Sequence, residues 1–232
     1  MRLRREPASA TSVRWKVIAI ALPAFLAGPV SFVLFPVGFD SVVRLWVNDV
    51  LVRIVIPMLC LYVLYRNDVR PRDYGMGRFL GRHTTNEFIS ITFLCTVGFL
   101  GYILVDAVVR AILDLAVPVK AGVGFSGTKL TVVAALYFSL AAAIFEEVLF
   151  RGVLAFALLG ARTLIRVALY VLISSVFFSL AHVDSDLPGL VALAYTGVVA
   201  SIAYVVVQNV WPLIIAHFCT DLFIYFWWLA KP

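Results

Sequence analysis

The sequence predicts an all-α protein, a polytopic bundle of about seven transmembrane helices, and two observations support this expectation. Of the 232 residues, 63% are hydrophobic and only 14% are charged, whereas roughly 25% of the residues in an ordinary soluble domain are charged. Apolar stretches of about 15 to 23 residues also recur from end to end, each close to the roughly 20 residues that a helix needs to cross a bilayer. Together these observations exclude a water-soluble globule.

The first two expected spans need the most justification. An apolar run at residues 17–35 follows a basic N-terminus, but it is too long for the core of a signal peptide. The second span is weaker, because its unbroken apolar run at residues 54–65 gives only about 18 Å of helix. Arg53 and its polar neighbours must therefore lie at an interface or face protein. The full set of expected spans is 17–36, 45–65, 88–112, 129–156, 164–182, 188–207 and 210–229.

The charge distribution predicts the orientation of the chain and its class of partner. A net charge of +6, with arginines between the apolar stretches, suits the anionic headgroups of a lipid bilayer and not nucleic acid. Residues 1–16 and the loop at 66–87 are the most basic segments, so the positive-inside rule places both in the cytoplasm. Because the chain is short and shows no retention signal, we expect it in a bacterial inner (plasma) membrane.

Ionisable side chains inside apolar helices deserve separate attention, because they are expensive at bilayer depth unless they are paired. In the third span, Asp106 and Arg110 are four residues apart, which predicts a self-neutralising pair that faces the bundle. Three cysteines lie inside apolar stretches without CxxC spacing, which predicts small buried hydrophobic residues and neither disulfides nor zinc ligands. They are Cys60, Cys95 and Cys219.

Two adjacent carboxylates stand in the apolar fourth span. Glu146 and Glu147 should point about 100° apart on a helix, so they cannot share one role. Arg151 lies four residues after Glu147, which predicts an ion pair that lowers the cost of burying both charges. Glu146 is then free to face a cavity.

Two histidines end the series of candidates. His182 closes the fifth span one turn after Phe178, where a lone histidine can also be an ordinary interfacial residue. His217 and Asp221 share one face of the seventh span, where the alternative role is a hydrogen-bonded clasp between helices. Together with Glu146 they form an acid/base set carried on three helices, as expected of a hydrolytic centre.

Three chemistries are compatible with this set of side chains. Covalent acyl chemistry is weakly supported, because no serine or cysteine lies in a GxSxG motif. Two histidines and two carboxylates could bind a divalent metal, although the HExxH spacing of zinc proteases is absent. In the third chemistry a carboxylate activates water directly and a histidine orients that water. This last route needs no metal and no cofactor.

The candidate residues resemble, in order along the chain, the three motifs of the CPBP family. That family comprises the CaaX prenyl endopeptidases of type II and the bacteriocin-processing or self-immunity proteins, also called Abi proteins. The resemblance covers about residues 129–225, and it rests on Glu146-Glu147-x-x-x-Arg151, Phe178-x-x-x-His182 and His217-x-x-x-Asp221.

The resemblance implies a glutamic intramembrane protease that cleaves a membrane-anchored protein or peptide near a terminus. Glu146 would be the general base, and His182 would help to hold the attacking water. His217 and Asp221 would stabilise the oxyanion. The supporting residues would be Glu147, Arg151 and Phe178.

One position departs from the pattern of the prenyl endopeptidases. Their last motif typically ends in Asn, whereas this chain has Asp221. Either Asp221 is protonated, or it accepts a hydrogen bond from His217 and fixes the tautomer of that ring. The departure weakens the inference to prenylated substrates and keeps the metal alternative open.

The expected division of the chain is a basic cytoplasmic N-terminus at 1–16, N-terminal transmembrane helices with their basic loop at 17–128, and a catalytic core at 129–230. Two other functions stay open: a non-catalytic peptide-binding, immunity or scaffold protein of the same fold, and a metal-dependent membrane hydrolase. On straight helices Glu146 and His182 would lie about 10 Å apart along the membrane normal. Catalysis would require a tilted or longer fourth helix, or a deeper fifth one.

Overall fold

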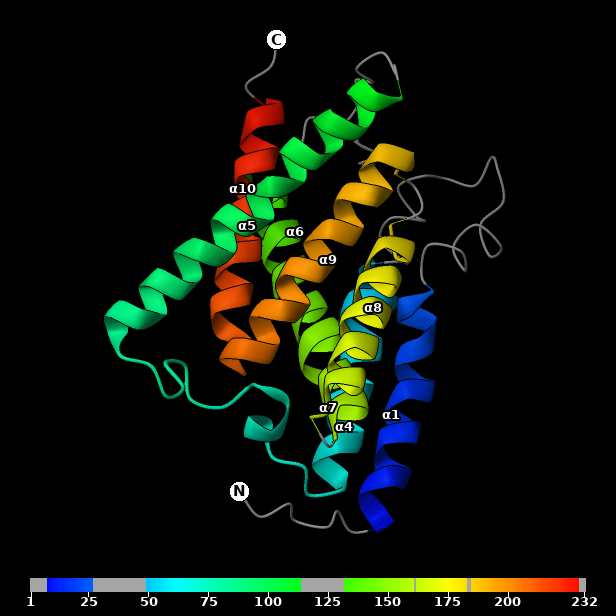
Figure 1. The fold of residues 1–232 in the computed structure, drawn as a ribbon. Helices are drawn as coiled ribbons and strands as arrows, with labels where there is room; N and C mark the ends of the chain where they lie inside the picture. Colours follow the sequence, from blue (N-terminus) through cyan, green and yellow to red (C-terminus); the bar gives the residue numbers. More distant parts are fainter. Residues whose placement is uncertain (1–7, 27–48, 114–131, 161, 183–184, 230–232) are drawn as a thin grey trace.

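The structure, a computed structural model, describes residues 8–26, 49–113, 132–160, 162–182 and 185–229, and every regular element in these ranges is helical (Figure 1). Two elements, η1 and η3, are π-helical, and η2 is a short 3-10 helix. The elements are α1 (Ala8–Phe25), η1 (Asp49–Val55), α4 (Ile56–Arg66), η2 (Pro71–Tyr74), α5 (Thr85–Ile112), α6 (Val132–Glu146), η3 (Glu147–Val153), α7 (Leu154–Leu159), α8 (Leu164–Leu180), α9 (Leu187–Val207) and α10 (Trp211–Leu229).

Within the described ranges these elements form seven long helices, because η1 continues into α4, and α6, η3 and α7 form one continuous helix. The all-helical prediction is confirmed. Two of the described helices, α5 and α9, are long and apolar enough to cross a membrane, and α8 and residues 211–226 are shorter apolar helices.

The first helix differs most from its predicted bounds. It begins at Ala8, not at residue 17, because basic residues such as Arg14 continue a helix well although they interrupt the apolar run. The predicted residues 27–36 of this span lie outside the described part of the chain. The fourth helix extends to Leu159, a little beyond its predicted end at 156.

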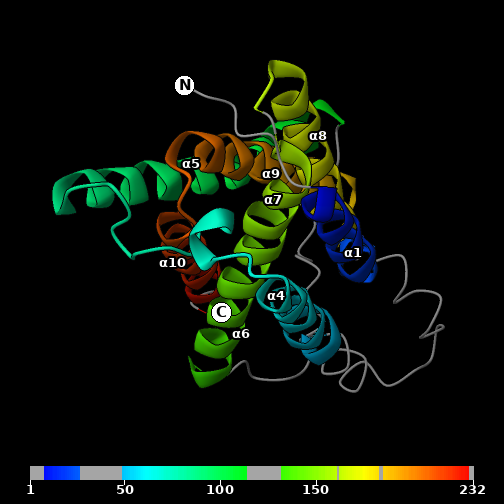
Figure 2. The ribbon, with the colours of Figure 1, turned by 90° about the horizontal axis from the view of Figure 1, so that it is seen from below.

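The helix α6–η3–α7 runs through the middle of the molecule. Seen from below, α1 and α4 lie on one side of it and α5, α9 and α10 lie on the other (Figure 2). α10 packs against both α5 and α6, and α8 packs against α9. The central helix therefore has protein on both sides, and all seven residues of η3 are buried.

The basic loop after α4 fixes the start of α10. Gly152 in η3 is needed here, because a Cβ atom would stand 2.6 Å from the carbonyl oxygen of Tyr74. The next residue of the loop, Gly75, accepts a hydrogen bond of 3.1 Å from the backbone N–H of Val210. The loop thus ties the central helix to the start of the helix that carries His217.

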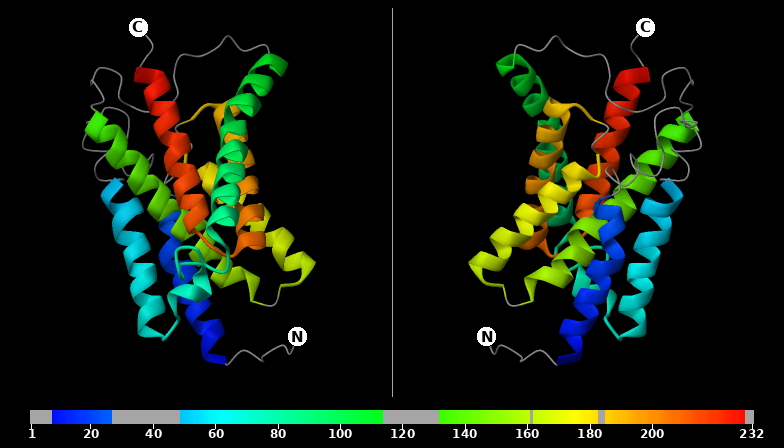
Figure 3. Two further views of the ribbon diagram at one scale, coloured as in Figure 1. Left: turned by 90° about the vertical axis from the view of Figure 1, so that its left-hand side faces the viewer. Right: turned by 90° about the vertical axis from the view of Figure 1, so that its right-hand side faces the viewer.

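The basic loop and the start of α1 lie at the same end of the bundle, together with the turn between α7 and α8 (Figure 3). This shared end agrees with the prediction that the two basic segments face one side of the membrane.

Among the cysteines, Cys60 and Cys95 are buried as expected, whereas Cys219 is exposed, so its predicted burial is wrong.

Candidate active site

The two adjacent glutamates lie where α6 changes into the π-helix η3. Glu146 is the last residue of α6, and Glu147 is the first of η3. Single turns of π-helix occur frequently at functional sites, because the extra residue changes the directions of the side chains. Here the two carboxyl groups meet different parts of the chain: Glu146 meets the η1–α4 helix and His182, which follows the end of α8, whereas Glu147 meets α10.

Glu146 is not free, as the sequence had suggested, because it is ion-paired with Arg53. The Nε atom of Arg53 lies 3.3 Å from Oε1 of Glu146. The expectation that Arg53 must face protein or an interface is confirmed, but the sequence did not indicate its partner. The sequence indicated only that a charged side chain in an apolar helix needs some partner.

His182 lies on the other side of the Glu146 carboxyl group. Its Nε2 atom is 4.0 Å from Oε2 of Glu146, and its Nδ1 atom is 2.8 Å from the carbonyl oxygen of Phe178. A carbonyl can only accept, so Nδ1 carries a hydrogen, and Nε2 of a neutral ring has its lone pair available. A gap of 4.0 Å is too long for a direct hydrogen bond, but a water about 2.8 Å from both atoms would bridge it.

The predicted separation of about 10 Å between Glu146 and His182 is therefore wrong. It assumed straight helices parallel to the membrane normal. In the structure α8 is strongly tilted and its last residues lie at mid-height of the bundle (Figure 3). A deeper placement of the fifth helix thus brings His182 to Glu146.

Glu147 is the centre of a second, buried cluster. Its Oε1 lies 2.8 Å from Nδ1 of His217, and its Oε2 lies 3.2 Å from Nε of Arg151. The predicted pair of Glu147 and Arg151 is thus present, with both side chains 0% exposed. However, none of the three guanidinium nitrogens of Arg151 has a hydrogen-bond partner among the described residues.

The tautomer of His217 is set by Glu147, not by Asp221. Because an ionised carboxylate only accepts hydrogen bonds, Nδ1 of His217 donates to Glu147. The other ring nitrogen, Nε2, lies 3.6 Å from Oδ2 of Asp221, which is an ion-pair distance only for a protonated ring. The structure therefore does not support the alternative in which Asp221 fixes the tautomer of His217. The closer partner of this ring is Glu147 on the central helix.

Phe178 connects the two clusters through its ring. Its centroid lies 5.1 Å from the ring of His182 and 6.2 Å from the ring of His217. The guanidinium carbon of Arg151 stands 4.4 Å from the same centroid, within the range of a cation–π contact. Phe178 thus holds both histidines and gives the buried arginine the face of an aromatic ring.

The described residues include no group of three or more His, Cys, Asp or Glu side chains that could hold a metal ion. His182 and His217 each direct one ring nitrogen to a protein oxygen, at Phe178 and Glu147 respectively. The first observation gives no support to a metal site among the described residues. The second is neutral, because a histidine that binds a metal commonly donates its other ring N–H to a carbonyl or carboxylate oxygen.

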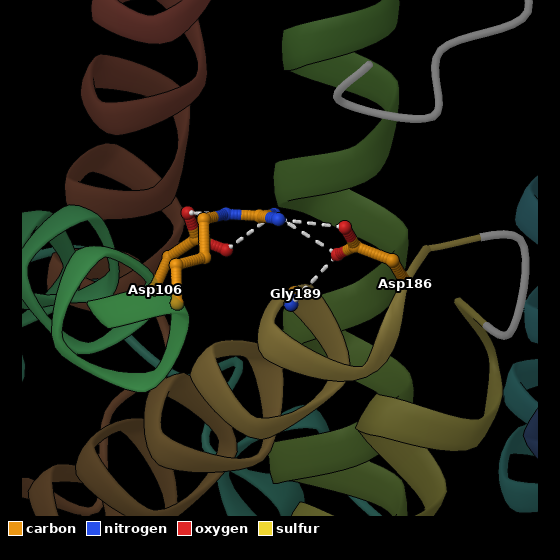
Figure 4. Close-up of polar contacts among 4 residues, drawn as sticks. Asp106, Asp186 and Gly189 are labelled. Carbon is orange, nitrogen blue, oxygen red and sulfur yellow. Dashed lines mark hydrogen bonds and ion pairs between the residues drawn. The ribbon is translucent and has the colours of Figure 1, made fainter. Parts of the chain in front are cut away.

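A separate clasp joins the last part of α5 to the start of α9 (Figure 4), at the opposite end of the bundle from the basic loop (Figure 1). Arg110 binds Asp106, as predicted, at 2.8 and 2.9 Å. It also binds Asp186, the N-cap of α9, at 2.7 and 3.0 Å. These bonds from Arg110, with a bond from the backbone N–H of Gly189, lower the pKa of Asp186. The clasp ties α5 to the segment that follows His182.

Comparison with known proteins adds one finding. Residues 128–223 match the family described as Type II CAAX prenyl endopeptidase Rce1-like, a family of membrane-integral peptidases. The matched range contains all seven side chains that the sequence singled out for the site. No curated protein and no solved structure matches the chain.

Proposed function

We propose that this chain is a glutamic intramembrane peptidase that cleaves a membrane-anchored protein or peptide near a terminus. Its residues 128–223 match the Rce1-like family of type II CAAX prenyl endopeptidases, which supports the proposal. The observation that carries the proposal is the facing pair of Glu146 and His182, with 4.0 Å between Oε2 and Nε2. A carboxylate base and a histidine acceptor at this distance can hold one water between them.

In the proposed mechanism this water attacks the scissile carbonyl carbon. Glu146 takes one proton from the water, while Nε2 of His182 accepts the other hydrogen and orients the oxygen. When the peptide bond breaks, the proton held by Glu146 passes to the leaving amine. Arg53 acts as a positioning residue, because its contact with Oε1 of Glu146 leaves Oε2 directed at His182.

The oxyanion would be stabilised from α10. Since Nδ1 of His217 donates to Glu147, its Nε2 can donate to an oxyanion only in the imidazolium form. Asp221 can donate only when it is protonated. A donor of this kind is worth about 10²- to 10³-fold in kcat. Glu147, Arg151 and Phe178 then serve to hold His217 in place.

The membrane placement of the site is part of the same proposal. The seven long helices would be seven spans in a bacterial inner membrane, with residues 1–16 and the basic loop in the cytoplasm and residues 129–230 as the catalytic core. Two described helices, α5 and α9, have the length and composition of membrane spans, which supports this arrangement. A substrate anchored in the bilayer could then reach the site from the lipid.

The test compares protein termini in membranes of cells that express the wild type, Glu146→Ala or Asp106→Asn at equal levels. Mass spectrometry of terminal peptides needs no prior guess of the substrate. We expect new termini with the wild type and with Asp106→Asn, the matched carboxylate control, and none with Glu146→Ala. Identical profiles for all three, under conditions where the wild type has a phenotype, would instead indicate a peptide-binding or scaffold protein.

A further inference from the structure

A second site lies at the basic end of the bundle, away from the glutamates. A cavity of about 110 Å³ opens there between α1, the basic loop, the end of α7 and the end of α9. By helical rise, Gly160 is about 20 Å along the central helix from Glu146, so the cavity is not part of the proposed active site. Its lining includes Arg14, Asp73, Phe156, Gly160, Arg162 and Tyr204.

Arginines from two separate parts of the chain converge at this cavity. Arg14 of α1 lies over the ring of Phe156, with its guanidinium carbon 5.5 Å from the centroid. A Cβ atom at Gly160 would meet Nη1 of Arg14 and, at 2.7 Å, Nη1 of Arg166. Both guanidinium groups therefore approach the same point of the backbone.

The charge at this point is only partly compensated by protein. In the part of the chain that the structure describes, neither Arg162 nor Arg166 has an ion-pair partner. Asp73, the acidic group in the lining, already accepts a hydrogen bond of 3.0 Å from the backbone N–H of Arg70. It also lies 3.9 Å from Nε of Arg72. Converging guanidinium groups of this kind match the planar, bidentate recognition of a phosphate.

The size and the surroundings of the cavity define the ligand further. A volume of about 110 Å³ is several times the roughly 30 Å³ of one water in the liquid, so a tetrahedral oxyanion fits. The neighbouring outer surface is strongly apolar: Leu164 is 85% exposed and Trp15 is 67% exposed. Exposed tryptophans and aliphatic side chains beside arginines are typical of the boundary between headgroups and acyl chains.

We infer that this basic-end cavity binds the phosphate group of an acidic phospholipid, with Arg14, Arg162 and Arg166 as its ligands and the acyl chains lying along the apolar surface around Leu164. The phosphate joins α1, which precedes the family-matched segment, to the α7–α8 turn, which lies within it. Bound lipid therefore stabilises the packing of the N-terminal helix on the core, and this effect weakens as salt increases.

The experiment measures the melting temperature of the purified full chain in a neutral detergent. Phosphatidylglycerol, phosphatidylcholine or sodium phosphate is added to the wild type, to Arg162→Gln/Arg166→Gln, and to the matched control Arg78→Gln/Arg82→Gln, whose arginines are exposed on the basic loop. At a hundredfold excess over Kd, phosphatidylglycerol should raise the melting temperature of the wild type and the control by about 5–10 °C. The Arg162/Arg166 variant should lose most of that rise.

The added lipids, the phosphate and the variants distinguish the possible causes of a rise in melting temperature. An equal rise with phosphatidylcholine, or an undiminished rise in the Arg162/Arg166 variant, would overturn the proposal. If sodium phosphate alone reproduced the rise and the variant lost it, the ligand would be free phosphate and the lipid assignment would be wrong. If the double variant does not fold, Arg162→Gln and Arg166→Gln are measured singly, and each should lose part of the rise.

Discussion

Two arginine–carboxylate pairs in this protein look alike in the sequence and differ in the structure. In both, an acidic residue precedes an arginine by four positions: Asp106 with Arg110, and Glu147 with Arg151. Arg110 makes four hydrogen bonds to the carboxylates of Asp106 and Asp186. The Asp186 side chain is 40% exposed. The Arg151 side chain is 0% exposed and has an ion pair and an aromatic ring, but no hydrogen bond among the described residues.

The difference separates a structural clasp from the cluster that we propose to be functional. A satisfied network near the surface holds two helices together and requires no further explanation. An arginine that is buried without hydrogen bonds is rare, because such a group loses its hydration without full replacement. The cluster around Glu147 is retained, in our account, because it holds His217 for the reaction.

The largest expected effect is on stability at the buried cluster. Glu147→Ala leaves the Arg151 charge buried without its partner, so the free energy of unfolding should fall by about 3–5 kcal/mol. The loss is measured by denaturation of the purified protein in detergent. A change below about 1 kcal/mol would show that water already reaches Arg151, and the contrast between the two pairs would then disappear.

Removing both charges of the buried cluster should partly reverse this loss. Replacing a buried ion pair by apolar groups of similar volume is often neutral or stabilising, so Glu147→Leu/Arg151→Met should be more stable than Glu147→Ala by about 2 kcal/mol or more. Cleavage should be absent from both variants, because His217 lacks its hydrogen-bond acceptor. A double variant that cleaves at the wild-type rate would contradict the role given to Glu147.

At the clasp the expected effect on stability is much smaller. Asp186→Asn removes one partly exposed negative charge that pairs with Arg110. Because Arg110 still binds Asp106, the free energy of unfolding should change by less than about 1 kcal/mol. The same denaturation assay measures it. A loss as large as that of Glu147→Ala would mean that the two arginines are equally dependent on their partners.

The smallest effect is the pH dependence of the clasp. The folded protein lowers the pKa of Asp186, so this carboxylate stabilises the fold at pH values above the ordinary pKa of about 3.9. The contribution is lost as the pH falls through the lowered pKa. The difference in melting temperature between the wild type and Asp186→Asn should therefore be present at pH 6 and shrink below about pH 4. A difference that disappears already between pH 7 and 5 would contradict this assignment.

Both pairs also show what the sequence could predict. The four-residue spacing of Glu147 and Arg151 depends only on local helix geometry, and both predicted pairs are present. The contacts of Arg53 with Glu146 and of Arg110 with Asp186 join segments far apart in the chain. Such contacts depend on how the helices tilt and pack, which periodicity does not record.

The same limit applies to the candidate site. Its residue types and order were predictable, because acid/base groups in apolar helices stand out by composition. The distance between Glu146 and His182 was not, since it depends on the tilt of α8 (Figure 3). The π-helical turn at Glu147 also has no compositional signal, because it differs from an α-helix only in its hydrogen-bond pattern.

The central claim is that the adjacent glutamates perform separate tasks, with Glu146 as the base and Glu147 as the support. The most direct test is the cleavage rate of Glu146→Gln in proteoliposomes, on a substrate identified by the comparison of termini. Loss of a general base predicts a fall of about 10²- to 10⁴-fold, with a melting temperature close to that of the wild type. A Glu146→Gln protein that cleaves at the wild-type rate would contradict the account.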